Sequence, residues 1–178
     1  MQLRDYQEVS VTAVAKKLTQ KRKVIFQLAT GGGKTITFSA ITKRYIDKGG
    51  KVLILVHRKE LMVQTVRTLF RAYGISAQMI RAGMKFVPPS NVYVGMVEST
   101  IRRIPAHIGL VIIDEAHNLS FAKIHEHFPT QMIIGFTATP LTGSKHKPLK
   151  NYYEDIVCGI DIPDLIAQGS LAQNITFA

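Results

Sequence analysis

Residues 24–35 read Val24-Ile25-Phe26-Gln27-Leu28-Ala29-Thr30-Gly31-Gly32-Gly33-Lys34-Thr35, an apolar run followed by a glycine turn and then by Lys-Thr. Glycines allow backbone N–H groups to converge on an anion, because no Cβ blocks the left-handed conformations that this requires. A helix-like segment follows, and its positive N-terminus points at the same place. Lys34 can reach the β- and γ-phosphates of a nucleotide, and the Thr35 hydroxyl can hold Mg²⁺. The stretch therefore predicts a phosphate-binding loop for a nucleoside triphosphate.

The loop departs at one position from the general pattern G-x-x-x-x-G-K-[ST]. The first glycine of that pattern is replaced by Leu28. This position opens the turn and brings no side chain to the phosphate, so the departure changes the prediction little. The alternative is a glycine-rich turn between strand and helix that binds nothing. The strand before the turn and the helix after it favour phosphate binding.

A second candidate motif lies near the middle of the chain. Gly109-Leu110-Val111-Ile112-Ile113 reads as a fully buried strand of a parallel sheet, and Asp114-Glu115-Ala116-His117 follows it directly. Ligands of such sheets bind beyond the carboxyl ends of the strands. One carboxylate there can orient Mg²⁺, and a second can position and deprotonate the water that attacks a γ-phosphate. The alternative is an acidic pair that only begins a helix, where negative charge is favourable.

Five short motifs in order resemble the first RecA-like motor domain of superfamily-two helicases and translocases of the DEAD/DEAH-like type. Residues 29–35 are similar to motif I of that family, residues 114–117 to motif II, and residues 137–140 (Thr-Ala-Thr-Pro) to motif III. Residues 55–61 resemble motif Ia, and residues 3–7 resemble the adenine-reading Q-motif. The resemblance covers almost the whole chain. It implies an α/β fold, a RecA-like P-loop NTPase domain with a mostly parallel sheet and helices on both faces.

The resemblance also implies a role for each matching residue. ATP would be bound by Arg4, Gln7, Thr30, Gly31, Gly32, Gly33, Lys34 and Thr35, with Gln7 and Arg4 reading the adenine. Thr35 and Asp114 would hold Mg²⁺, and catalysis would rest on Glu115 as the base, with Asp114 and Lys34. The γ-phosphate state would be coupled to the nucleic-acid track by His117, Thr137 and Thr139.

Two of these roles have plain structural alternatives. Gln7 could be an exposed polar residue on an amphipathic helix. Thr137 and Thr139 could instead place their hydroxyls as caps of a turn before Pro140. Neither alternative is removed by the sequence.

The family's nucleic-acid track maps onto residues that follow two of the predicted strands: His57, Arg58, Ser99, Thr100 and Arg103. Such contacts to phosphate fix position without reading sequence. Few aromatic residues flank these positions, so base stacking is not expected to dominate. Arg58 could instead be an ordinary residue at a helix start, and Arg102 and Arg103 a solvated face. Motifs Ia and III are more similar to those of DNA-repair, restriction and phage-type members than to those of RNA helicases, which favours DNA over RNA.

Composition agrees with a soluble nucleic-acid-binding domain. The 178 residues suffice for one domain with a substantial core, and the net charge of +11 suggests a polyanionic partner. The alternative is a basic surface that only aids solubility. One cysteine, Cys158, excludes an internal disulfide and fits a reducing compartment, the cytoplasm or nucleoid, rather than secretion. No apolar segment is long enough to cross a bilayer, so no membrane partner is expected.

Strand and helix signals alternate along the chain, which implies right-handed crossovers and a parallel sheet. Gly49-Gly50 and Gly74 mark helix ends, and a basic loop is expected over 141–151. We expect strands over 24–28, 52–56, 77–80, 92–95, 109–113 and 132–136. We expect helices over 4–18, 34–47, 58–73, 97–103, 121–127 and from Asp161 to Gly169.

No second phosphate-loop lobe and no arginine-rich motif follow residue 140. Members of the family close two such lobes over ATP, and the second supplies an arginine finger. We therefore expect residues 1–178 to be a single ATP-binding lobe of a larger helicase or translocase, nearly inactive alone. The rival functions are a small P-loop kinase and a nucleotide-dependent nucleic-acid-binding module without catalysis, such as the motor lobe of a restriction-type translocase. His125 and His127 face different ways at i and i+2 on a helix, which argues against a zinc site.

Overall fold

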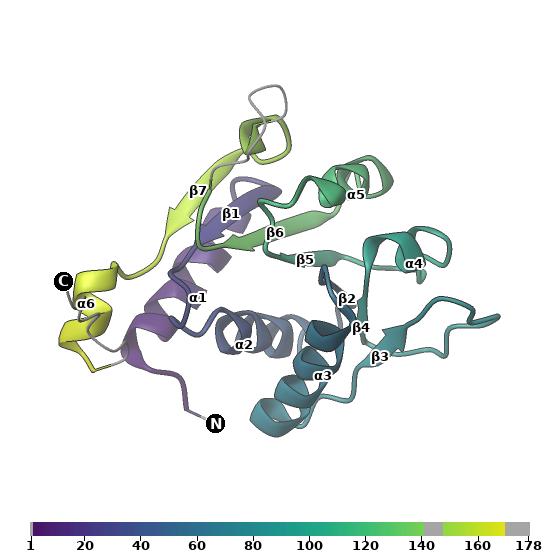
Figure 1. Ribbon diagram of the computed structural model, residues 1–178, viewed down its shortest axis with the longest axis horizontal. Helices are drawn as coiled ribbons and strands as arrows, with labels where there is room; N and C mark the ends of the chain where they lie inside the picture. Colours follow the sequence, from purple (N-terminus) through teal and green to yellow (C-terminus); the bar gives the residue numbers. More distant parts are fainter. Residues whose placement is uncertain (1, 141–147, 170–178) are drawn as a thin grey trace, which may run out of the picture.

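The fold is an α/β layered structure around one parallel sheet. The computed structural model describes residues 2–140 and 148–169. Its seven strands pair side by side in the order β3-β4-β2-β5-β6-β1-β7, and every pair is parallel (Figure 1). The strands are β1 Lys23–Gln27, β2 Val52–Leu55, β3 Gln78–Ile80, β4 Val92–Gly95, β5 Leu110–Asp114, β6 Met132–Thr137 and β7 Asp155–Cys158.

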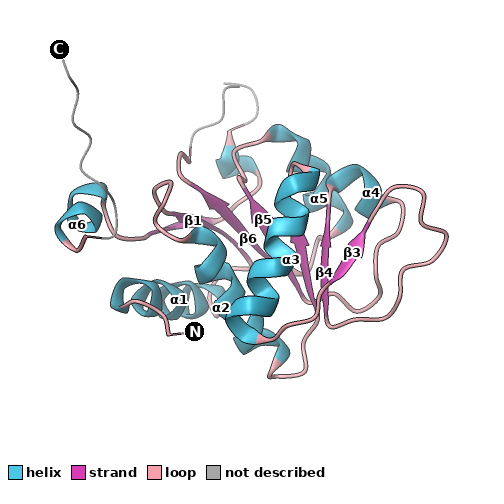
Figure 2. Ribbon diagram, turned by 60° about the horizontal axis from the view of Figure 1, so that its bottom comes forward, coloured by secondary structure: helices cyan, strands magenta, loops and turns pink. Residues whose placement is uncertain are grey.

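Helices cover both faces of the sheet. The helix α1 contacts α2, and α2 contacts α3 on one face, while α4 and α5 contact each other on the other (Figure 2). Their bounds are α1 Asp5–Leu18, α2 Lys34–Ile46, α3 Lys59–Tyr73, α4 Val97–Ile101, α5 Ala122–His127 and α6 Ile162–Ala167. Two 3₁₀ turns, η1 Leu119–Phe121 and η2 Leu149–Asn151, precede α5 and β7.

The apolar core consists of two clusters, one on each face of the sheet, because successive side chains of a strand point to opposite faces. In β1, Val24 and Phe26 face the cluster under α1, α2 and α3, whereas Ile25 faces the cluster under α4 and α5. The central strands β2, β4 and β5 are buried along their whole length. Continuous apolar strands are what a sheet covered on both faces requires. This confirms the predicted fold class.

The predicted elements are confirmed within one or two residues at most ends, with three differences. The helix expected over 97–103 ends at Ile101. The edge strand β7 was not predicted, because its apolar run is only three residues long and only Val157 of its four residues is buried. The expected basic loop lies outside the described residues over 141–147, and its last three residues form η2.

All strands are parallel, so their carboxyl ends meet at one edge of the sheet. The phosphate loop follows β1 there, and Asp114 and Thr137 end β5 and β6. The strands β5, β6 and β1 are neighbours, which brings these three segments together. The segments that follow β2 and β4 lie at the same edge, over the other half of the sheet.

Candidate functional site

The phosphate loop adopts a conformation that depends on its glycines. Gly31 and Gly33 have φ values of 82° and 84°, in the left-handed region that other residues avoid. A Cβ on Gly33 would lie 2.5 Å from Nε2 of Gln7, and one on Gly32 would lie 2.9 Å from Cγ of Leu28. The loop is therefore a close-fitting backbone cradle, as an anion site built from N–H groups requires.

Leu28 and Tyr6 support this loop from below. Leu28, which replaces the first glycine of the general pattern, is 1% exposed and fills the space beneath Gly32. The Tyr6 hydroxyl donates to the carbonyl of Gly32 at 3.0 Å. A role for Tyr6 was not predicted from the sequence, where the one available signal is its position next to Gln7.

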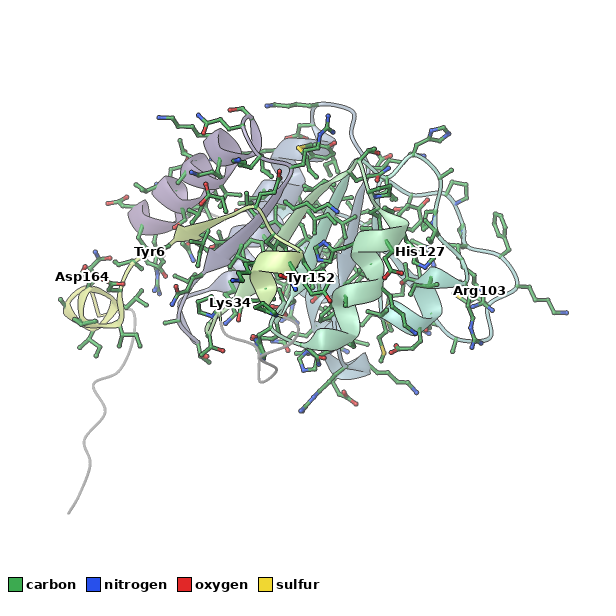
Figure 3. All side chains as sticks on the ribbon, turned by 90° about the horizontal axis from the view of Figure 1, so that it is seen from above. Tyr6, Lys34, Arg103, His127, Tyr152 and Asp164 are labelled. Carbon is green, nitrogen blue, oxygen red and sulfur yellow. The ribbon has the colours of Figure 1, made fainter. Side chains whose placement is uncertain are left out.

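Lys34 is the first residue of α2, so the helix start places its side chain over the carboxyl edge (labelled in Figure 3). The side chain is only 10% exposed, and its Nζ lies 3.4 Å from Oε1 of Glu115. The ammonium of the phosphate loop and the carboxylate that follows β5 thus face each other directly. A γ-phosphate bound by Lys34 would lie against Glu115.

Glu115 is held in an unusual backbone conformation. Its φ is 54°, which costs a residue with a Cβ roughly 1–3 kcal/mol. Its N–H donates to Oδ1 of Asp114 at 3.1 Å, and the next N–H, of Ala116, donates to the carbonyl of Phe136 at 2.8 Å. These bonds turn the chain out of the strand direction at Glu115. Strain of this kind gathers at functional sites, where it aims a side chain.

Asp114 is buried at the end of β5, with 8% of its surface exposed. Burial raises the pKa of its carboxyl above the ordinary value, and the negative charge of Glu115 raises it further. The Lys34 ammonium, the Glu115 N–H and His57 oppose that rise in the pKa. A buried carboxylate with too little positive charge around it is a group that a bound cation would stabilise.

His117 connects Glu115 to motif III. Its Nδ1 lies 2.9 Å from Oγ1 of Thr137 and 3.4 Å from Oε2 of Glu115. The Thr137 hydroxyl donates to the carbonyl of Thr139 at 2.8 Å and accepts the Thr139 N–H at 3.1 Å. With that hydroxyl proton directed at Thr139, the Thr137 oxygen is placed to accept a hydrogen bond from His117 in the tautomer that carries its proton on Nδ1. Thr137 therefore closes the turn before Pro140, as the structural alternative held, and also contacts His117.

Gln7 is buried against the phosphate loop, with 5% of its surface exposed. Its Oε1 accepts the N–H of Arg4 at 3.0 Å, and its Nε2 lies beside Gly33. The alternative of an exposed Gln7 is therefore wrong. Arg4 itself is exposed. Gln7 thus lies at the phosphate loop and Arg4 is bonded to it through its backbone, and the contact of both with adenine stays a prediction.

A family model decides the assignment. It describes the res subunit of type III restriction enzymes, and it matches residues 1–142. The chain belongs to this res-subunit family. The resemblance to superfamily-two helicases is thereby confirmed.

Two curated relatives of this res-subunit domain are named as helicases. The putative ATP-dependent helicase IRC3 of Saccharomyces cerevisiae is 36% identical over 161 residues, which cover 77% of this chain and 23% of that protein. The putative mitochondrial ATP-dependent helicase irc3 of Schizosaccharomyces pombe is 30% identical over 192 residues, covering 97% of this chain and 32% of that protein. The chain thus spans a quarter to a third of the length of these relatives.

Solved structures share the fold of this res-subunit domain. The type ISP restriction-modification enzyme LlaGI, solved in complex with a DNA substrate mimic, matches with a TM-score of 0.75 at 18% identity, over 96% of this chain and 21% of that one. Helicase domains match in the same way, which establishes the RecA-like arrangement.

The candidate track residues occupy different environments. Arg58 is exposed at the N-cap of α3, and Ser99 is half-buried in α4. Thr100 is fully buried against Gly95, so its side chain lies in the interior rather than on the surface. His57 is half-buried beside Asp114, and its Nδ1 is buried without a hydrogen-bond partner. Arg103 bonds to the carbonyl of Met84 instead of lying free.

His125 and His127 show no sign of a metal centre. Within the described ranges, no three His, Cys, Asp or Glu side chains are grouped closely enough to hold an ion. His125 packs against the rings of Tyr152 and Tyr153, with centroids 5.2 and 4.8 Å away. Burial, aided by the charge of Lys23, lowers the pKa of His125 to about 4, so the ring is neutral at physiological pH.

Replacing Asp114 with asparagine should stabilise the nucleotide-free chain at neutral pH. The folded-state pKa of Asp114 is raised, so the folded chain binds the proton more tightly than the unfolded chain. Stability is therefore lost as pH rises from the ordinary value of 3.8 through the folded pKa, and asparagine avoids that loss. Thermal unfolding should show a higher Tm for Asp114→Asn at pH 7 and a smaller gain toward pH 4.

The control is Asp155→Asn, because the pKa of Asp155 is shifted in the opposite direction to that of Asp114. A hydrogen bond from Lys17 lowers the pKa of the Asp155 carboxyl, so this substitution should leave the Tm lower or unchanged. A lower Tm for Asp114→Asn at pH 7 would show that its charge stabilises the free chain.

Proposed function

We propose that this chain is the ATP-binding lobe of a nucleic-acid helicase or translocase that acts on DNA. It hydrolyses ATP with Mg²⁺ when a second RecA-like lobe closes on it. The observation that carries the proposal is the 3.4 Å approach of Lys34 Nζ to Glu115 Oε1 at the carboxyl edge of the sheet. A phosphate-binding ammonium and a carboxylate able to act as base are the two side-chain groups that ATP hydrolysis needs at one point.

The binding step uses the backbone of the phosphate loop. The amides of residues 31–35 and the Lys34 ammonium take up the charge of the triphosphate, and Gln7 with Arg4 contacts the adenine. The left-handed φ of Gly31 and Gly33 supports this step, and the loop packs so closely that a Cβ on Gly32 or Gly33 would clash with Leu28 or Gln7. Thr30, at the start of the turn, adds a hydroxyl to the same site.

Thr35 and Asp114 would hold Mg²⁺. The ion would supply positive charge to offset the negative charge of the triphosphate there. Magnesium usually binds through one or two protein oxygens together with phosphates and water, rather than in a cage of protein ligands. The buried, raised-pKa carboxyl of Asp114 and the lack of a larger ligand cluster among the described residues fit that mode.

In the hydrolytic step, Glu115 acts as the general base. In the free chain Glu115 is paired with Lys34. When Lys34 turns to the γ-phosphate, the Glu115 carboxylate is released to orient a water and accept its proton. His117, which lies against both Glu115 and Thr137, then relays the state of the phosphate to Thr139 and the turn before Pro140.

DNA and a second lobe are the proposed partners. The net charge of +11 favours a polyanion, and the LlaGI relative of the same fold was solved with a DNA substrate mimic. The contacts are assigned to His57, Arg58, Ser99 and Arg103, whereas Thr100 would have to leave the interior to take part. Residues 1–178 make one lobe, and the matched relatives are three to four times longer, which leaves room for the other.

A second candidate is a nucleotide-dependent DNA-binding module without its own catalysis, as in a restriction-type translocase. The match to the res-subunit family of restriction enzymes supports this second candidate.

We propose that the protein works in a reducing compartment, since Cys158 is free and exposed. The cytoplasm, the nucleoid and the mitochondrial matrix all satisfy that condition. In the part of the chain that the structure describes, no helix has the length and apolar character to span a bilayer.

The test is to measure ATP affinity and hydrolysis with and without DNA. We expect the isolated chain to bind Mg²⁺-ATP weakly, to hydrolyse it very slowly and to unwind nothing, because an arginine finger from a second lobe is worth roughly 10³–10⁵ in rate. Adding the second lobe should restore DNA-stimulated turnover. Robust DNA-stimulated hydrolysis by the chain alone would contradict the single-lobe proposal, and phosphate transfer to an acceptor would indicate a kinase. Nucleotide-dependent DNA binding without turnover in the two-lobe protein would favour the second candidate.

A further inference from the structure

The connection between the adjacent parallel strands β3 and β4 contains no helix and carries an exposed aromatic ring. It leaves the carboxyl end of β3 after Ile80 and enters the amino end of β4 at Val92. Figure 1 shows this loop projecting beyond the β3 edge of the sheet. Phe86, near its middle, is 69% exposed.

The loop is held on both sides of Phe86. The Arg103 Nε donates to the carbonyl of Met84, and the Arg81 N–H contacts the Met84 sulfur at 3.2 Å. On the other side, Val87 packs against the apolar cluster under α4 and α5. Phe86 therefore lies between two tethered residues and stays outside the core. The ring is displayed at a fixed place on the surface.

The surroundings of Phe86 are cationic. Lys85 precedes it, and both Lys85 and Arg81 are exposed. Arg103 adds a third cation through its bond to the loop. No Asp or Glu occurs from Arg81 to Val97. A single exposed apolar side chain needs no explanation, but an aromatic ring among cations is the combination that binds single-stranded nucleic acid, since cations neutralise phosphates while the ring stacks on a base.

The loop also lies next to the candidate nucleic-acid track. The strands β3, β4 and β2 are neighbours, so the start of the loop lies at the same edge as the segments that follow β4 and β2. Arg103, a candidate track residue, bonds directly to the loop, and Figure 3 places it at the end of the molecule away from α6. A nucleic-acid strand that contacts Arg103 would therefore lie close to the loop that carries Phe86.

We propose that Phe86 stacks on a base of the nucleic-acid strand, with Lys85 and Arg81 against its phosphates. This inference rests on the proposed function, because it requires a nucleic acid on the carboxyl edge. It adds a contact that the sequence analysis did not expect, since stacking was thought to contribute little. The contact is independent of base identity, because every base offers a flat face.

The chain contains no tryptophan, so Phe86→Trp introduces a single fluorescent reporter at the site. Oligodeoxythymidylate should quench this indole at least about twofold, as stacking on a base does. An abasic deoxyribose-phosphate strand of the same length should bind without quenching. The matched control is Phe70→Trp, because Phe70 is 61% exposed near the end of α3, which runs back toward the amino edge. Its fluorescence should respond to neither strand.

Binding measured by fluorescence anisotropy of a labelled strand completes the test. Phe86→Ala and Phe86→Leu should weaken binding about fivefold or more, Phe86→Tyr should retain it, and Phe70→Ala should change nothing. The unsubstituted chain and the Phe86→Ala variant could bind the labelled strand equally well, with no quenching in Phe86→Trp. In that case the stacking inference is wrong and the proposed function stands. Equal quenching by the abasic strand would also overturn stacking. If the unsubstituted chain binds no nucleic acid at low salt, both proposals fail.

Discussion

Replacing Lys34 with alanine should abolish detectable ATP binding while leaving the chain folded. The ammonium is the one side-chain cation that the phosphate loop itself supplies, and a charge-assisted hydrogen bond in such a site is worth about 1.5–3 kcal/mol before Coulomb attraction to the triphosphate is added. We expect the Kd for Mg²⁺-ATP to rise by at least about 100-fold, as measured by titration calorimetry. The Tm of the free chain should fall only slightly, since the substitution removes the ion pair with Glu115 and a positive charge near Asp114 but no residue of the apolar core.

The control for this substitution is Lys43→Ala. Lys43 lies on the same helix, α2, and forms an exposed ion pair with Asp47 four residues on, which is worth only a few tenths of a kcal/mol. The Lys43→Ala variant should bind ATP with the same Kd as the unsubstituted chain. If Lys34→Ala keeps its affinity for ATP, the phosphate loop is not the nucleotide site.

Replacing Glu115 with glutamine should separate binding from hydrolysis. In the two-lobe protein we expect kcat to fall by about 10²–10⁴, because the amide cannot accept the proton of the attacking water. ATP affinity should stay equal or increase, since Lys34 loses the carboxylate that competes with the γ-phosphate for its ammonium. Single-turnover hydrolysis together with a nucleotide titration measures both quantities.

Glu126→Gln serves as the matched control, because Glu126 is an exposed glutamate of α5, outside the site. Its kcat should equal that of the unsubstituted protein. Loss of ATP binding in Glu115→Gln would assign Glu115 a structural role, consistent with its left-handed backbone, and would leave the base unidentified.

The sheet and its functional edge were predictable because their signals are local. Short apolar runs such as 52–56 and 109–113, bounded by turn residues, are typical of strands buried on both faces, and parallel strands put their carboxyl ends together. The glycine turn after residue 28 and the acids after residue 113 therefore had to meet at one edge. The 3.4 Å contact of Lys34 with Glu115 agrees with that expectation.

Features that depend on tertiary contacts could not be predicted. Strand β7 is formed by pairing with β1 rather than by its own composition. Gln7 and Thr100 are polar residues that the packing of α1 and α4 buries, and no pattern in their neighbours states this. The positive φ of Glu115 arises from bonds that its flanking residues make, and the anchoring of Met84 by Arg103 joins segments 19 residues apart.

The most direct test is a crystal structure of this chain with Mg²⁺ and a nonhydrolysable ATP analogue. We expect phosphates on the amides of residues 31–35, with the ion at Thr35 and Asp114. Lys34 should have left Glu115 for the γ-phosphate, and Glu115 should face that phosphate through a water. An empty loop at saturating analogue, or a nucleotide bound elsewhere while Lys34 stays paired with Glu115, would contradict this expectation.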